Sequence, residues 1–117
     1  MIAEASRLAE AGQLAVLQGM RDPGLLRPET LADLFRASAA REGGRILYRS
    51  GTRTVTWAEA EALTDRAAAR LAAAGARSGT VIGLWMPRGI DLLLAQVAIA
   101  KSGAAFLPFD ADAPVDR

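Results

Sequence analysis

The amino-acid sequence predicts an α/β fold that forms the N-terminal part of a larger layered α/β domain. An apolar strand at 80–86, an apolar helix at 90–102 and a second apolar strand at 104–109 follow one another. Neither strand alternates between apolar and polar residues, which is typical of parallel strands covered on both faces. The helix is apolar nearly all round, so we expect it to be buried on more than one side. Such a unit needs more covering polypeptide than 117 residues supply.

Composition narrows the class of protein. The chain is 51% hydrophobic and 23% charged, as in globular proteins, and its length allows one domain at most. A net charge of +1 gives no reason to expect nucleic acid or an anionic membrane as a partner. The apolar run at 90–100 is too short to span a bilayer, which needs about 20 residues. The absence of cysteine excludes disulfides and thiolate sites, and together with a start that lacks a basic cluster it favours a cytoplasmic protein.

The N-terminal region divides at about residue 28. Apolar residues at helical spacing predict a helix over 3–18, and the sequence "RDPGLLRPET" that follows is rich in turn-forming residues. We therefore assign residues 1–28 to a helical lead-in or linker and residues 29–117 to the N-terminal fragment of the larger domain.

A helix is predicted over 31–41. Thr30 is a suitable N-cap, with Asp33 as the third helical residue, and two glycines at 43–44 end the helix. We expect Leu31, Leu34 and Phe35 to form its buried side.

A hairpin and a second helix come next. Short strands at 46–49 and 54–56 flank a turn on Ser50–Gly51. Thr56 and Glu59 then form a capping box for a helix that a left-handed glycine at 75 ends. Four apolar residues recur along this helix at steps of three and four, and we expect them to share its buried face. They are Ala60, Leu63, Ala67 and Leu71.

The C-terminal third is predicted to be a right-handed parallel βαβ unit, flanked by the preceding helices. Gly103 ends the helix at 90–102 because glycine adopts the left-handed cap at little cost. Pro108 lacks an N–H group, so we expect strand pairing to end or weaken there. The acidic loop beyond it follows the carboxyl end of a parallel strand, where open α/β sheets bind ligands.

No single residue or short motif makes a strong case for a functional site. Gly89 lies near a helix N-terminus and could hold an anion, but an ordinary strand-to-helix turn is favoured. Asp110, Asp112 and Asp116 begin like a calcium loop, yet Pro114 and Val115 break the pattern, which favours a solvated loop. Lys101 is interpreted as a helix-terminal lysine whose ammonium reaches solvent, in preference to a catalytic group.

Nucleophilic catalysis finds no support in the residues present. The chain has no histidine to act as a base, and none of its serines lies in a Gly-x-Ser-x-Gly turn. We therefore assign no catalytic, cofactor-binding or metal-binding residue to this chain.

Two segments resemble motifs of the adenylate-forming enzymes. "VTWAEAEAL" is similar to the early (L)-T-Y-x-E-L motif, with Trp57 for tyrosine and Ala60 for leucine. "AKSGAAFLPFDADAP" is similar to L-K-A-G-x-A-Y-x-P-x-D, with Ser102 for alanine and Phe106 for tyrosine. The resemblance covers roughly 31–117. Pro108, Asp110, Pro114 and Arg117 make it more like the amino-acid-activating domains of nonribosomal peptide synthetases than the fatty acyl-CoA branch.

The resemblance implies that the full-length parent is an ATP-dependent ligase that uses Mg²⁺ to join a carboxylic acid to AMP. The acyl group then passes to the thiol of a carrier protein or of CoA. The family's phosphate loop, ribose-binding acid, hinge and C-terminal lysine have no counterpart here, so we expect the fragment to be inactive alone and to require the remainder of the adenylation domain as partner. The alternatives are an acyl-CoA synthetase fragment, or a non-catalytic α/β interaction module.

Overall fold

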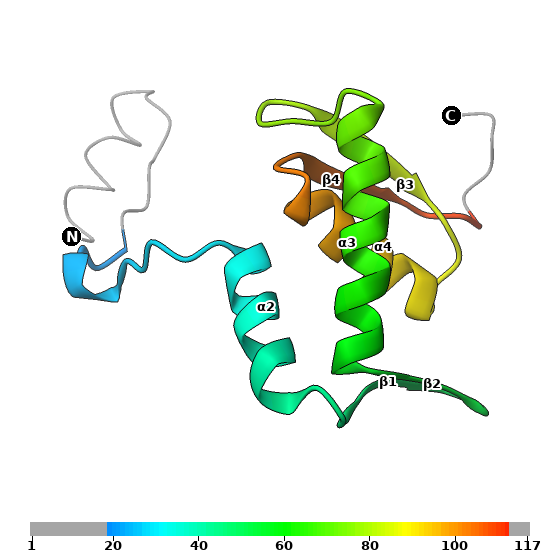
Figure 1. Ribbon diagram of the computed structural model, residues 1–117. Helices are drawn as coiled ribbons and strands as arrows, with labels where there is room; N and C mark the ends of the chain where they lie inside the picture. The colour runs from blue at the N-terminus through cyan, green and yellow to red at the C-terminus, as the bar shows by residue number, and fades with distance from the viewer. Residues whose placement is uncertain (1–18, 113–117) are drawn as a thin grey trace.

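The computed structural model describes residues 19–112. The helix that the sequence predicts at 3–18 lies outside this range. The described chain alternates helices and strands as predicted (Figure 1). Its elements are η1 (Pro23–Leu25), α2 (Leu31–Glu42), β1 (Ile46–Ser50), β2 (Arg53–Thr56), α3 (Trp57–Ala73), β3 (Val81–Trp85), α4 (Ile90–Lys101) and β4 (Ala105–Phe109). No helix among these residues is long and apolar enough to cross a membrane.

The N-cap predicted at Thr30 and the capping box predicted at Thr56 are confirmed, and both form complete capping boxes. The Thr30 hydroxyl accepts from the Asp33 N–H at 3.2 Å, while the Asp33 carboxylate accepts from the Thr30 N–H at 2.9 Å. Thr56 and Glu59 make the same pair of hydrogen bonds at the start of α3, at 3.3 and 2.8 Å. Each box satisfies backbone N–H groups that a helix N-terminus leaves without partners, so these short motifs define where α2 and α3 begin.

The two predicted glycine caps are also confirmed. Gly75 has φ +102° after the end of α3, and Gly103 has φ +83° after the end of α4. The Gly103 N–H donates to the Ala100 carbonyl at 3.1 Å, which closes the last turn of the helix. The chain can therefore leave α4 and enter β4 within a few residues.

The hairpin is antiparallel, with Tyr48 opposite Val55 and Ser50 opposite Arg53. Ser50 belongs to the strand and the turn lies one residue later than predicted, where Gly51 has φ +57°. The hairpin lies at the lower end of α3 in Figure 1, because β2 runs directly into that helix.

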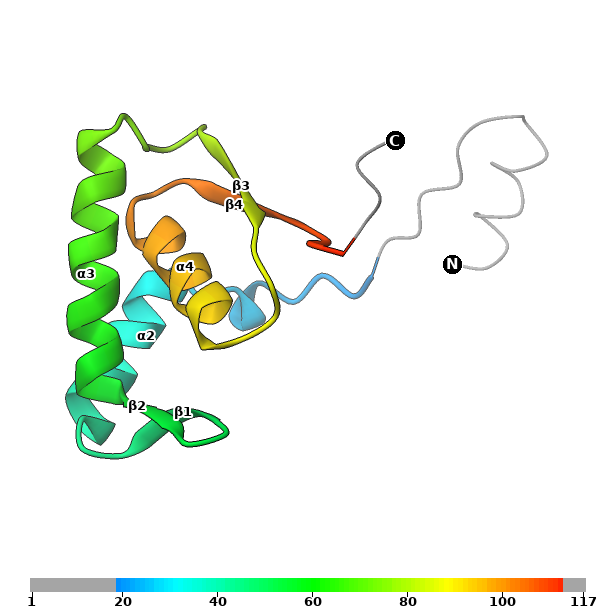
Figure 2. The same cartoon turned by 90° about the vertical axis from the view of Figure 1, so that its right-hand side faces the viewer.

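α4 occupies the centre of the described fold. Figure 2 shows this helix almost end-on, between α3 and the parallel pair formed by β3 and β4. Five of its residues are buried: Ile90, Leu94, Val97, Ala98 and Ile99. The prediction that this helix is covered on more than one side is confirmed. The right-handed sense of the crossover stays a prediction.

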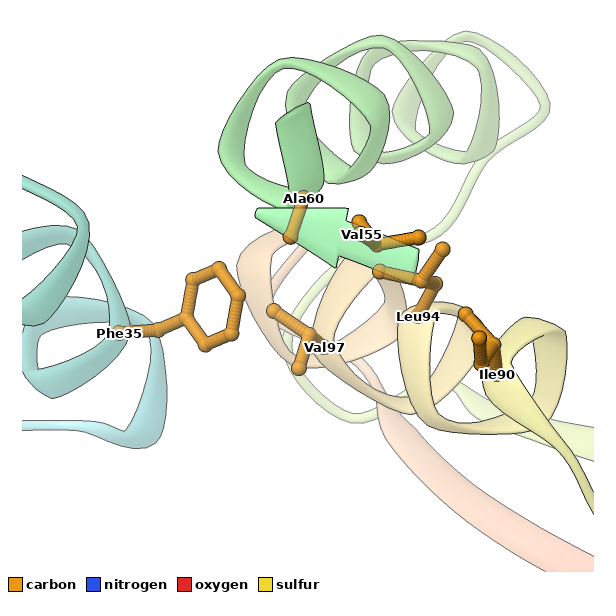
Figure 3. Packing of buried hydrophobic residues seen from close by; sticks show 6 residues of the cluster. All are labelled: Phe35, Val55, Ala60, Ile90, Leu94 and Val97. Carbon is orange, nitrogen blue, oxygen red and sulfur yellow. The ribbon is translucent and has the colours of Figure 1, made fainter. Parts of the chain in front are cut away.

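Two hydrophobic clusters meet on α4. The first joins α2, β2, α3 and α4, and Figure 3 shows its side chains converging. Its buried members are Phe35, Val55, Ala60, Ile90, Leu94 and Val97. The second consists of Leu84, Ile99 and Ala104, and it attaches the helix to the two parallel strands. α4 thus connects the helical layer to the sheet.

The prediction that three leucines of α2 and α3 are buried is wrong. Leu31 and Leu34 are 51% and 44% exposed, and the buried side of α2 is Ala32, Phe35 and Ala39. On α3 the buried residues are Ala60, Thr64 and Ala68, whereas Leu63 is 38% exposed. On α3 the contact face consists of small residues, and on α2 two alanines flank the one large buried side chain, Phe35, which was predicted correctly. Side-chain size misled the prediction about which face is buried.

Pro108 does not end the sheet. Pairing continues through Leu84 opposite Pro108 to Trp85 opposite Phe109. The Ala105 N–H donates to the Thr80 carbonyl, so alternate residues from Ala105 onward turn their backbone groups toward β3. Pro108 belongs to the other set, and its missing N–H falls on the edge of β4 that faces away from β3.

Candidate functional site

The carboxyl ends of β3 and β4 lie side by side, as a parallel pair requires. Trp85 and Phe109 are register partners at this end. The turn leading to α4 follows one strand, and the acidic loop follows the other. Asp112 donates its N–H to Asp110 Oδ1 at 3.1 Å, which closes a local turn in that loop. The structure thus places Asp110 and Asp112 just beyond the carboxyl end of a parallel pair, the end at which open α/β sheets bind ligands.

One face of this strand pair is uncovered among the described residues. Ile82 and Leu84 face α4, so the alternate residues of β3 and their partners in β4 face the other way. The outer face carries Val81, Trp85, Leu107 and Phe109, with exposed fractions of 63%, 63%, 49% and 55%. The backbones of the two strands lie close to α4 and to each other. We refer to these four residues as the outer sheet face.

Gly83 has a packing role on the outer sheet face. A Cβ atom added at this position would lie 2.9 Å from Cε2 of Phe109. The aromatic ring therefore lies across β3 in space that a side chain at residue 83 would fill.

The start of α4 carries its own acidic side chain. Gly89 is the N-cap residue and offers no side-chain hydrogen bond. Asp91 in the first turn already places a carboxylate near the positive end of the helix. Arg53 holds this carboxylate with two hydrogen bonds of 2.8 and 3.0 Å, and the guanidinium lowers the pKa of Asp91. These contacts are compatible with the ordinary turn that the sequence favoured, and that interpretation stays a prediction.

The prediction that the Lys101 ammonium reaches solvent is wrong. The lysine side chain is 1% exposed, so the ammonium does not reach solvent. Nζ donates to Asp65 Oδ1 at 2.8 Å and lies 5.3 Å from the centroid of the Phe35 ring. It also lies 2.7 Å from Glu61 Oε2, although this oxygen makes no geometrically acceptable hydrogen bond with the described residues.

Sequence reasoning missed this buried lysine because the motif around it reads as a helix end. One signal was available: Glu61 and Asp65 are four residues apart on α3, so their carboxylates lie on one side of that helix. A cation from a neighbouring helix can bridge such a pair.

A shallow groove of about 400 Å³ lies between β2 and the exposed side of α3. Leu63 and Val55 contribute apolar lining, and the charged lining groups include Arg53 and Glu59. Arg53 is bonded to Asp91 and Glu59 caps α3, so both groups already have structural partners.

The metal hypothesis gains no support within the described range. Residues 19–112 contain no group of three or more candidate ligand side chains that could hold a metal ion. Asp116, the third carboxylate of the calcium-like pattern that the sequence disfavoured, lies outside that range. Ser102 has a local structural contact, because its hydroxyl donates to the Ile99 carbonyl at 2.7 Å.

Comparison with known sequences identifies similar proteins. Residues 35–117 match the family described as AMP-binding enzyme. The chain is 41% identical over 102 residues to delta-poly-L-ornithine synthetase of Acinetobacter baumannii. That alignment covers 87% of this chain and 8% of the synthetase, so the chain spans less than a tenth of this curated relative.

Solved structures agree on the fold. Klebsiella oxytoca NpsA, as its N-terminal subdomain, superposes with a TM-score of 0.70 at 22% identity, over 74% of this chain and 23% of that one. The artificial NpsA–ThdA fusion, an adenylation–PCP di-domain, gives a TM-score of 0.73 at 21% identity, covering 77% and 18%. The nonribosomal peptide synthetase FmoA3, bound to alpha-methyl-L-serine-AMP, gives 0.71 at 28% identity, covering 74% and 10%.

Proposed function

The chain belongs to the AMP-binding enzyme family, and we propose that it is the N-terminal part of an adenylation domain that activates an amino acid with ATP. In this proposal residues 29–117 belong to the domain and residues 1–28 lead into it. The observation that carries the proposal is the family match over residues 35–117. The uncovered outer sheet face supports it, because a layered α/β domain places further structure there.

The proposed reaction joins the carboxylate of the substrate to the α-phosphate of ATP, and pyrophosphate leaves. The acyl group of the resulting acyl-adenylate then moves to the thiol of a carrier protein. FmoA3, which is similar to this chain, binds an aminoacyl-AMP, and the NpsA–ThdA structure combines an adenylation domain with a PCP. The first likeness supports an amino acid as substrate, and the second supports a carrier as partner.

ATP and Mg²⁺ belong to the complete enzyme in this proposal. Magnesium and basic groups offset the charge on the separating phosphates. The described acidic side chains do not gather into a ligand set that fits the metal, so no step of the reaction is assigned to them. In this proposal the chain contributes structure. Its helix α4 packs between the other helices and the β3–β4 pair and so positions the carboxyl ends of the two strands.

A pyrophosphate exchange assay tests the proposal. The 117-residue chain and the same chain extended to a complete domain are each incubated with ATP, labelled pyrophosphate and a panel of amino acids. We expect exchange from the extended protein with at least one amino acid and none from the chain alone. Exchange by the chain alone, or an extended protein that exchanges with no carboxylic acid, would contradict the proposal.

The alternatives predict different results in the same assay. An acyl-CoA synthetase would exchange with fatty acids and not with amino acids, and its acyl group would go to CoA. A non-catalytic interaction module would support no exchange in either form. We place the enzyme in the cytoplasm, where ATP is supplied, and we propose neither nucleic acid nor membrane as a partner.

A further inference from the structure

Lys101 links three helices at a single buried point. Its ammonium contacts Glu61 and Asp65 of α3 and the Phe35 ring of α2. Arg36 of α2 approaches the other Glu61 oxygen, with 4.0 Å between Nε and Oε1. Asp65 is 53% exposed and Glu61 is 23% exposed, so the network runs from the core to the surface.

The rest of the α3–α4 contact is poorly directional. The buried residues of α3 are Ala60, Thr64 and Ala68, which present a smooth surface of small side chains. α4 is apolar along most of its length, and the hydrophobic effect does not depend on direction. A slip of α4 by one turn, about 5.4 Å, would still bury apolar surface against α3.

The contacts of Lys101 disfavour such a slip of α4 along α3. A slipped arrangement would separate the lysine ammonium from at least one of the two carboxylates that it now bridges, and a buried charge that loses a partner is disfavoured. Lys101 is the last residue of α4, and β4 begins at Ala105. Any slip of α4 would therefore shift the start of β4 and its pairing with β3.

We propose that Lys101 is a positioning residue that fixes the register of α4 against α3, and through it the register of β4 against β3. The ion contacts select one arrangement among several that bury similar apolar area. This role goes beyond the proposed function, since it concerns how the chain folds whether or not the complete protein is an enzyme. A single polar contact can set helix register in this way.

The test uses hydrogen–deuterium exchange, read by mass spectrometry, on the full 117-residue chain. The principal variant is Lys101→Met/Glu61→Met, which removes both buried charges and keeps apolar volume. Asp65 stays because its carboxylate is largely solvated. Arg53→Met is the matched control: it breaks the exposed Arg53–Asp91 pair at the other end of the same helix.

We expect the double variant to fold but to populate more than one register. Peptides covering β4 should exchange on the order of tenfold faster than in the unsubstituted chain, or show two isotope populations. The unsubstituted chain and Arg53→Met should show one slow population. Lys101→Met alone leaves the Glu61 carboxylate buried without its cation, so it should be less stable than the double variant.

Three results would overturn the proposal. The first is a double variant with unchanged exchange and a single population in β4, because register would then not depend on the lysine. The second is a double variant that does not fold, because the network would then supply stability and not selection. The third is a Lys101→Met chain as stable as the double variant, because the buried ion contact would then be absent.

Discussion

Gly103 is the residue through which α4 becomes β4. Its φ of +83° lies in the left-handed region, which β-branched residues avoid. Space does not limit this position, since an added Cβ would lie 3.5 Å from the Ser78 backbone nitrogen, an ordinary contact. The requirement for glycine is therefore conformational.

Gly103→Val is expected to lower the free energy of unfolding by about 1–3 kcal/mol, the cost of holding a non-glycine residue in this region. Urea denaturation followed by circular dichroism measures the loss. Gly44→Val is the control, because Gly44 has no positive φ and an added Cβ there meets open space. An unchanged midpoint for Gly103→Val would show that α4 does not end in this way.

Glu59 gives the N-terminus of α3 a pH dependence. Hydrogen bonds from the Thr56 backbone N–H and hydroxyl lower the pKa of its carboxyl group. Because the folded pKa lies below the unfolded one, the carboxylate stabilises the fold above about pH 4, and this contribution is lost as the pH falls further. Hydrogen bonding by Thr30 lowers the pKa of Asp33 in the same way.

Glu59→Gln is expected to make stability fall less steeply between neutral pH and pH 3. Urea midpoints for the chain and the variant at several pH values measure the two slopes. Asp112→Asn controls for loss of a negative charge, since Asp112 caps no helix. Parallel pH profiles for the chain and Glu59→Gln would contradict the capping role of this carboxylate.

At the scale of elements, α4 carries most of the packing. It shares Ile90, Leu94 and Val97 with the helices and the hairpin, and Ile99 with the strands. Leu93 is 40% exposed on the same helix, whereas Ile99 is 2% exposed. The two positions therefore compare a core contact with a surface position in one element.

Ile99→Ala is expected to lower the free energy of unfolding by about 2–5 kcal/mol, because it leaves a cavity between the helix and the strands. Leu93→Ala should cost about 1 kcal/mol or less. Urea unfolding of both variants checks the difference. Equal losses would mean that α4 is not sandwiched between the two clusters.

Local signals in the sequence were sufficient to predict most element boundaries. A capping box involves residues three apart and a glycine cap involves one residue, so Thr56, Glu59 and Gly103 could be interpreted without knowledge of the tertiary fold. Burial depends on which neighbour a helix face meets. The burial predicted for Leu34 and Leu63 was wrong for that reason: α2 buries Phe35 between two alanines, and α3 buries Ala60, Thr64 and Ala68.

Part of the candidate site could likewise be predicted from the sequence, and part of it could not. The position of the acidic loop at the end of β4 followed from chain order, and the structure agrees. The buried environment of Lys101 depends on Glu61 and Asp65, which lie 36 or more residues away in the chain. Only the packing of α4 on α3 reveals that contact.

At the scale of the whole molecule, the exposed apolar side chains of residues 19–112 include two groups of neighbouring residues. The outer sheet face carries Trp85 and Phe109, each more than half exposed. The segment before α2 carries Leu25 and Leu26, which are 75% and 81% exposed. The sheet face is the better candidate for association, because it is a continuous surface on paired strands.

The chain by itself is therefore expected to self-associate, or to bind an apolar dye, through the outer sheet face. Trp85→Thr/Phe109→Thr should reduce dye fluorescence and shift sedimentation toward the monomer, since threonine suits a strand and removes the aromatic surface. Leu25→Ser/Leu26→Ser removes a comparable pair of exposed apolar side chains elsewhere and should leave both readings nearly unchanged. The reverse result, in which only the leucine variant abolishes association, would locate the self-association surface in the segment before α2. In the extended domain the dye should bind weakly without any substitution, because polypeptide that follows in the fold would then cover Trp85 and Phe109.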